Sequence, residues 1–105
     1  MKVIIKDFDG RPYEAEIENK LEAMQKIVGG YIEVIPLTFD DVIVCNEDGK
    51  LKDLPHNFNM PVHGSIVGTV IICSEEGEGF TDFTDVKCTV EEFEQILRDW
   101  GNEAW

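Results

Sequence analysis

The chain has 105 residues and a hydrophobic fraction of 43%, which suits one domain, residues 1–105, with a modest core. Its 22 acidic and 9 basic residues give a formal net charge of −13. Direct binding to nucleic acid or to an anionic membrane is therefore not expected, because each phosphate contact needs a cation. No apolar run is long enough to span a bilayer, and Lys6 interrupts the first one too early for a signal peptide, so we expect a cytoplasmic protein.

Residues 2–17 predict a β-hairpin. The run at 3–5 is apolar and β-branched, and Asp9-Gly10 is a turn pair. After the turn, apolar residues alternate with glutamates, which is typical of a strand with one buried and one solvent-exposed face.

A helix is predicted over residues 20–28. Asn19 and Glu22 have the spacing of a capping box, in which each side chain bonds a free backbone N–H of the other residue. Apolar residues then recur at helical spacing, and Gly29-Gly30 supplies the C-terminal stop.

Two strands are predicted next, at residues 31–35 and 42–45, followed by a long surface loop over 51–64 that Leu54 and Phe58 anchor. Residues 65–73 form the most apolar run of the chain. The run is continuous after Gly68, as expected of a central strand buried on both faces.

The C-terminal part begins with an acidic, glycine-rich linker at residues 74–79. The three-residue repeat at 80–85 is compatible with a single helical turn. Thr89 and Glu92 form a second capping box, and an apolar stripe from Val90 to Trp100 predicts a helix that ends at Gly101. The order β-β-α-β-β-loop-β-α indicates an α+β domain, with a mixed or antiparallel sheet of about five strands and two helices on one face.

The cysteines and histidines do not predict a metal site or a cofactor. Cys45, Cys73 and Cys88 are widely spaced and odd in number, unlike a disulfide framework. His56 and His63 lie seven residues apart in the predicted loop, whereas zinc ligands usually come in short paired spacings.

One short motif resembles the first motif of haloacid-dehalogenase-type phosphatases. It is Asp7-Phe8-Asp9-Gly10 after an apolar strand, and the resemblance implies a nucleophile at Asp7, a general acid at Asp9 and bound Mg²⁺. Arg11 stands where that family has Thr, and Asp41 precedes a strand where the later acidic residue should follow one. A hairpin turn explains the same residues, and the chain is too short for that family's parallel sheet.

The charge distribution is uneven. Residues 74–105 contain ten acidic and two basic residues, a net charge of −8, whereas residues 1–73 have a net charge of −5. A solvated surface explains such charge, but so does an anionic face that docks into a basic groove. The candidate partner-binding carboxylates are those of Glu75, Glu76, Glu78, Asp82, Asp85, Glu91 and Glu94.

The stretch Gln25-x-Ile27-Val28-Gly29-Gly30-Tyr31-Ile32-Glu33, with Cys45-Asn46-Glu47-x-Gly49-Lys50-Leu51 after it, resembles a small family of unknown function, domain of unknown function 3846. The resemblance covers about two-thirds of the chain, and the last 30 residues fit less well. It implies an accessory protein of a phage, plasmid or conjugative element of Gram-positive bacteria. In that setting, small acidic proteins often inhibit host defence nucleases, as anti-CRISPR and anti-restriction proteins do.

Three functions remain open on the sequence. We expect a non-enzymatic protein that inhibits a host CRISPR or restriction nuclease by occupying its basic nucleic-acid groove. The alternative is a small-molecule or nucleotide-signal binder in which the 51–64 loop, with His56, Asn57, Asn59 and His63, covers a ligand. The third is a metal-dependent enzyme that uses Asp7 and Asp9.

Overall fold

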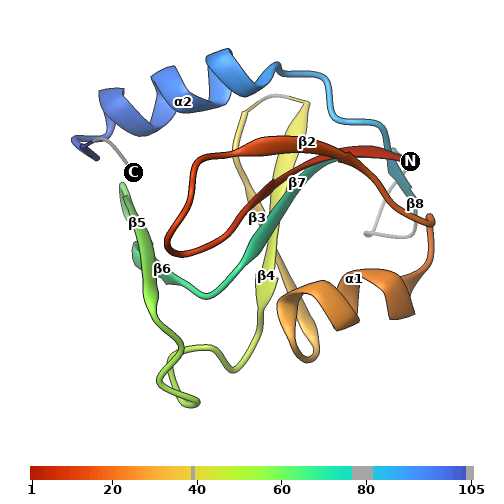
Figure 1. Cartoon of the computed structure of the whole chain (residues 1–105), viewed down its shortest axis with the longest axis horizontal. Helices are drawn as coiled ribbons and strands as arrows, with labels where there is room; N and C mark the ends of the chain where they lie inside the picture. Colours follow the sequence, from red (N-terminus) through yellow and green to blue (C-terminus); the bar gives the residue numbers. More distant parts are fainter. Residues whose placement is uncertain (39, 77–81, 104–105) are drawn as a thin grey trace.

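The computed structural model describes residues 1–38, 40–76 and 82–103 and is built around an antiparallel sheet (Figure 1). The main sheet has 6 strands, with the order β2-β1-β7-β4-β3 and with β8 paired to β7. The strands and helices are β1 (Lys2–Lys6), β2 (Tyr13–Glu16), α1 (Leu21–Val28), β3 (Ile32–Pro36), β4 (Asp41–Asn46), β5 (His56–Met60), β6 (Gly64–Val67), β7 (Val70–Glu76), β8 (Asp82–Thr84) and α2 (Val90–Asp99). The predicted α+β class, with two helices and an antiparallel sheet, is confirmed, as is the first hairpin, in which β1 pairs with β2.

Strand β7 is the centre of the sheet and is apolar on both faces. Its Ile71 and Cys73 pack in the cluster that α1 covers, and its Val70 and Ile72 pack in the cluster that contains Phe93 of α2. The helices therefore lie on opposite faces of the sheet, as Figure 1 shows, and the prediction that both pack on one face is wrong. The physical reason is that a strand buried on both faces needs cover on both.

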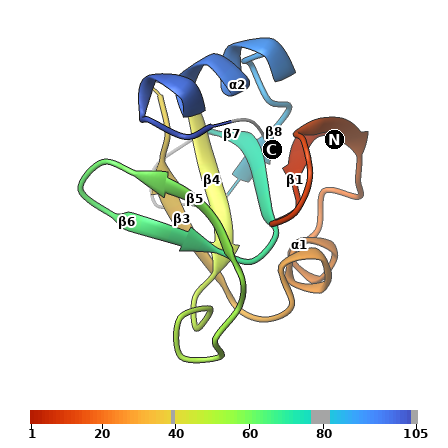
Figure 2. The ribbon, with the colours of Figure 1, turned by 60° about the vertical axis from the view of Figure 1, so that its left-hand side comes forward.

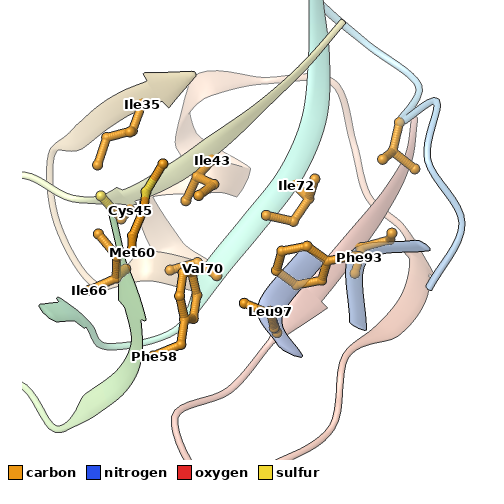
Figure 3. Close-up of a cluster of buried hydrophobic side chains, with 12 residues drawn as sticks. Ile35, Ile43, Cys45, Phe58, Met60, Ile66, Val70, Ile72, Phe93 and Leu97 are labelled. Atoms are coloured by element: carbon orange, nitrogen blue, oxygen red, sulfur yellow. The ribbon is translucent and has the colours of Figure 1, made fainter. Parts of the chain in front are cut away.

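On the α2 face, a separate β-hairpin completes the core (Figure 3). β5 pairs with β6 in a two-stranded sheet that projects beside β3 and β4 (Figure 2). Phe58 of β5 is fully buried, with its ring 6.1 Å from that of Phe93 and 6.4 Å from that of Trp100, measured between centroids. Burying a side chain of this size contributes about 1.5–3 kcal/mol, so Phe58 anchors the hairpin to α2.

Two predictions about residues 51–73 are corrected by this hairpin. The surface loop over 51–64 contains β5, and the single strand over 65–73 is two strands, β6 and β7. Gly68 separates them with a backbone φ of +74°, a left-handed conformation that favours glycine. The chain can therefore turn from the hairpin into the central strand at this residue.

One helix start agrees with the sequence and the other does not. Thr89 and Glu92 form the predicted capping box of α2, with N···O distances of 2.9 and 3.1 Å. The N-cap of α1 is Lys20, which makes no side-chain cap bond. Asn19 instead donates a hydrogen bond from Nδ2 to the backbone oxygen of Phe83, at 2.9 Å, because β8 lies beside it. Gly29 ends α1 with a φ of +83°, as expected.

The C-terminal repeat is also different from its prediction. Residues 82–84 are the strand β8, and residues 80 and 81 lie outside the described part of the chain, so a helical turn at 80–85 is wrong for the residues that can be seen. β8 pairs with the last residues of β7, in the register Ser74↔Thr84 to Glu76↔Asp82. Across the described residues, neither helix is long and apolar enough to cross a membrane.

Candidate binding surface

The acidic C-terminal segment contributes an exposed edge to the sheet. Glu76 and Asp82 are cross-strand partners in β7 and β8, and both are exposed. Directly opposed residues of an antiparallel pair have Cα atoms about 4.5–5.5 Å apart, so these two like charges are neighbours. Opposed like charges destabilise strand pairing. No basic residue occurs among the paired residues of β7 and β8 to offset the two carboxylates.

The N-terminus lies at the same end of the molecule, beside β8 (Figure 1), and brings a positively charged amine there. The backbone N–H of Lys2 donates to Oδ1 of Asp85 at 2.8 Å. Lys2 is also the register partner of Glu16, whose Oε2 lies 3.4 Å from the N-terminal amine. Glu16 thus lies near this end of the sheet although it is far from β8 in sequence, and it stays exposed while its charge is partly offset by the terminal amine.

Glu16, Glu76, Asp82, Asp85 and Glu91 are hereafter called the acidic surface. Glu91 is exposed in the first turn of α2, where a negative charge also stabilises the helix dipole. Sequence reasoning identified four of the five. It missed Glu16, and the only available signal was its position on the wet face of the first hairpin.

Glu94 does not belong to the acidic surface. Its side chain is 7% exposed and accepts hydrogen bonds from Arg11, with Oε2 lying 3.2 Å from Nε and 3.1 Å from Nη2. Arg11 is in the turn between β1 and β2, so the pair joins that turn to α2. The carboxylate is buried and ion-paired within the fold, so the structure gives Glu94 an internal contact in place of the exposed position expected of a partner-binding residue.

The two remaining candidates contribute less. Glu75 is half-buried, alternates with Glu76 along β7, and therefore points to the α1 face with its register partner Phe83. Glu78 lies outside the described residues.

Asp41, the candidate for the later acidic residue of the phosphatase motif, is buried and has a structural role. It accepts hydrogen bonds from the hydroxyl of Ser74 at 2.7 Å and from the backbone N–H groups of Lys87 and Cys88, each at 2.9 Å. Burial alone would raise the pKa of Asp41, but these hydrogen bonds outweigh it and hold the pKa below the ordinary value of 3.8. Asp41 thereby fixes the segment between β8 and α2, next to the acidic surface.

The Asp7-Phe8-Asp9-Gly10 motif occupies the turn of the first hairpin, as the simpler interpretation predicts. The N–H of Gly10 donates to the oxygen of Asp7 at 3.3 Å, and the hydroxyl of Thr69 donates to Oδ1 of Asp7 at 3.0 Å. The strand before the motif belongs to an antiparallel sheet, not to the parallel sheet of that phosphatase family.

The histidines and cysteines that the structure describes form no metal-binding cluster. Within residues 1–38, 40–76 and 82–103, no group of three His, Cys, Asp or Glu side chains is arranged to hold a metal ion. His56 bonds the hydroxyl of Ser65 at 2.6 Å. Burial raises the pKa of the Cys45 thiol to about 11 and of the Cys73 and Cys88 thiols to about 12. All three thiols are therefore protonated and weakly nucleophilic at neutral pH.

A cavity of about 370 Å³ lies between β5 and the end of α2, lined by His56, Asn57, Asn59 and Asn102 among others. Some of the polar groups in its wall already make hydrogen bonds within the protein. Asn57 accepts a hydrogen bond from the buried amine of Lys6 at 2.7 Å and donates to the backbone oxygens of Lys6 and Gly68. Burial lowers the pKa of Lys6, and the nearby charges of Asp7 and Asp9 oppose that shift.

Residues 1–97 match the family model described as Domain of unknown function (DUF3846). The chain therefore belongs to this family, as the motif around Gly29-Gly30 predicts, and the match extends further toward the C-terminus than that motif. The searches found no match to a curated protein or to a solved structure.

Proposed function

We propose that this chain is a non-enzymatic binding protein whose acidic surface docks on a basic surface of a partner protein. The observation that carries the proposal is the gathering of Glu16, Asp82 and Asp85, from both ends of the chain, around the edge formed by β8 and the N-terminus. Exposed charge of one sign steers association with a surface of opposite sign and adds specificity.

The target we propose is a host bacterial defence nuclease of the CRISPR or restriction type, inside the cytoplasm of the host cell. Such a nuclease has a basic groove that binds phosphates, and closely spaced carboxylates can take their place. The net charge of −13 supports this class of target and opposes direct binding to nucleic acid. The mobile-element setting implied by the family motif is part of the same proposal.

A capture experiment tests this function. The tagged protein is incubated with bacterial lysate, washed at low or high salt, and the retained proteins are identified by mass spectrometry. We expect a nucleic-acid-binding complex that is retained at low salt and lost at high salt, because salt screens exposed charge pairs. The nuclease identified in this way, purified separately and loaded with labelled DNA or RNA, should release the nucleic acid when the protein is added. Retention of no protein at either salt concentration would contradict the proposal.

The second candidate function is small-molecule binding, and the 370 Å³ cavity beside Asn57 and Asn59 is the observation that favours it. Its size is within the usual range for ligand pockets. Thermal unfolding with a panel of nucleotides tests it, since a ligand that binds only the folded state raises the melting temperature. A rise with one nucleotide, lost in Asn59→Ala, would favour this function over the first.

A further inference from the structure

β3 is the terminal strand of the main sheet, and its outer edge is not paired with any element in the described part of the chain. Its inner edge bonds β4 in the register Ile32↔Asn46 to Pro36↔Val42. On either side of that register, the N–H of Glu47 donates to the oxygen of Tyr31 at 2.8 Å, and the N–H of Leu37 donates to the oxygen of Asp41 at 3.0 Å.

These two bonds determine which backbone groups point outward. In an antiparallel ladder every second pair exchanges hydrogen bonds. Because the pairs at Tyr31 and Leu37 are bonded, the bonded pairs between them are at Glu33 and Ile35. Ile32 and Val34 therefore direct both their N–H and C=O groups to the open edge, and Pro36 directs only its C=O group.

The other terminal strand, β2, is better protected against pairing. It has four residues, of which Glu14 and Glu16 are exposed glutamates, and charged side chains are a common defence of sheet edges. β3 has five residues, with Glu33 as its one charged side chain and with Pro36 at its end. A strand from another molecule can therefore pair with the outer edge of β3 over residues 32–36. Pro36 limits how far this pairing can extend, because it has no N–H group to donate.

A cavity lies beside this edge, on the face that carries the β5–β6 hairpin. Its volume is about 160 Å³, and its lining includes Glu33 and Ile35 of β3, Cys45 of β4, Leu51 and Ile66. Its wall is mixed: Ile35, Cys45, Ile66 and Val67 are apolar, whereas Glu33, Glu47, Lys50, His63 and Ser65 are polar or charged. Glu33 is exposed, and Leu51 is 87% exposed beside the opening.

An incoming strand would place alternate side chains over this cavity. Residues of a strand that lie on one face are two apart, and directly opposed side chains of paired strands are in contact. Side chains opposite Glu33 and Ile35 would therefore enter the cavity together. Opposite charges favour a cation across from Glu33, and burial of apolar area favours an aliphatic side chain across from Ile35.

We propose that the outer edge of β3 is a second binding site, which takes an extended segment of a partner protein by strand addition. The segment carries Lys or Arg opposite Glu33 and an aliphatic residue two positions away, opposite Ile35. A second copy of this chain is a poorer occupant, because two molecules of net charge −13 repel each other. The site shares no residue with the acidic surface, so it does not depend on the proposed function.

The probe is an acetylated ten-residue peptide in which Lys and Val take turns at every second position with Thr between them, so that Lys and Val share one face. The control is the same peptide with N-methyl groups on the Thr residues, whose N–H groups would face β3. Both peptides have the same charge, but the control cannot donate its hydrogen bonds along one edge. We expect the control to bind about tenfold more weakly or worse, since two or more backbone hydrogen bonds are lost. Glu33→Lys should weaken the first peptide further than Glu22→Lys, which makes the same charge change on α1.

Amide hydrogen exchange locates the peptide. In the complex, exchange at Ile32 and Val34 should slow at least tenfold, whereas Glu33 and Ile35 should already exchange slowly in the free protein. Equal affinity of the two peptides, unchanged exchange at Ile32 and Val34, or no binding at all would overturn the proposal. Slow exchange at these two residues in the free protein, together with a dimer in sedimentation, would also overturn it, since a second copy would then occupy the edge.

Discussion

Arg11 and Glu94 form an ion pair that joins the turn of the first hairpin to α2. Nη2 of Arg11 lies 3.1 Å from Oε2 of Glu94, and the side chain of Glu94 is only 7% exposed. The pair explains how a helix of strongly acidic sequence packs one carboxylate against the sheet: an arginine from the other end of the chain neutralises it.

Replacing Arg11 should destabilise the fold through Glu94. Arg11→Met leaves a buried carboxylate without its main partner, and we expect a loss of about 1–2 kcal/mol in the free energy of unfolding, reduced because Arg11 itself is largely exposed. Urea denaturation measures this loss. The double variant Arg11→Met, Glu94→Gln should lose less than the sum of the two single variants, and simple additivity would show that the pair is not coupled.

Asp41 should contribute stability that depends on pH. Its pKa is lower in the folded than in the unfolded state, so the unfolded chain takes up the proton first as the pH falls. The contribution is complete above the unfolded pKa, near 3.8, and is lost as the pH falls through the folded pKa below it. We expect Asp41→Asn to cost about 1–3 kcal/mol at pH 7, because its amide group cannot accept all three hydrogen bonds.

Urea denaturation of Asp41→Asn and of the unmodified protein, at pH values from 7 down to 3, checks this account. The difference in unfolding free energy between the two proteins should be constant above pH 5 and should shrink as the pH falls below 4. A difference that stays constant over the whole range would mean that folding does not shift the pKa of Asp41.

Gly68 should tolerate no side chain. Its φ is +74°, and a Cβ atom there would lie 2.9 Å from Cδ1 of Leu54. We expect Gly68→Ala to lower the free energy of unfolding by about 1–3 kcal/mol. Gly10→Ala is the matched control, because its Cβ would meet no atom within 4 Å and its φ is not in the left-handed region. Equal stabilities of the two variants would contradict the role given to Gly68.

Local patterns predicted most elements of this fold. The alternation after Asp9-Gly10 indicated the first hairpin, Thr89 and Glu92 indicated the start of α2, and the continuous apolar run indicated a central strand. The sequence did not predict the β5–β6 hairpin, because β5 is mostly polar and only Phe58 and Met60 show the apolar alternation of a strand. One of its polar residues, Asn57, makes hydrogen bonds within the fold, which a sequence pattern does not show. Pattern alone does not reveal that such a segment forms a pair.

The candidate site was less predictable, since it depends on which strands are neighbours. Helical spacing places Glu94 at the border of the apolar stripe, between Val90 and Leu97, but the pattern does not reveal that Arg11 lies there to pair with it. Glu16 joins the acidic surface only because β1 lies between β2 and β7. The outward-facing backbone groups of Ile32 and Val34 likewise follow from the position of β3 at the end of the sheet.

The central claim, that the acidic surface binds a partner, is tested most directly by two charge-matched variants in the capture experiment. One reverses Glu76, Asp82 and Glu91 to Lys, and the other reverses Asp9, Glu22 and Glu103, which are also exposed. Each set of three reversals changes the net charge from −13 to −7. We expect the first variant to lose the captured complex and the second to retain it. Equal retention, or equal loss, by both variants would contradict a site-specific acidic surface.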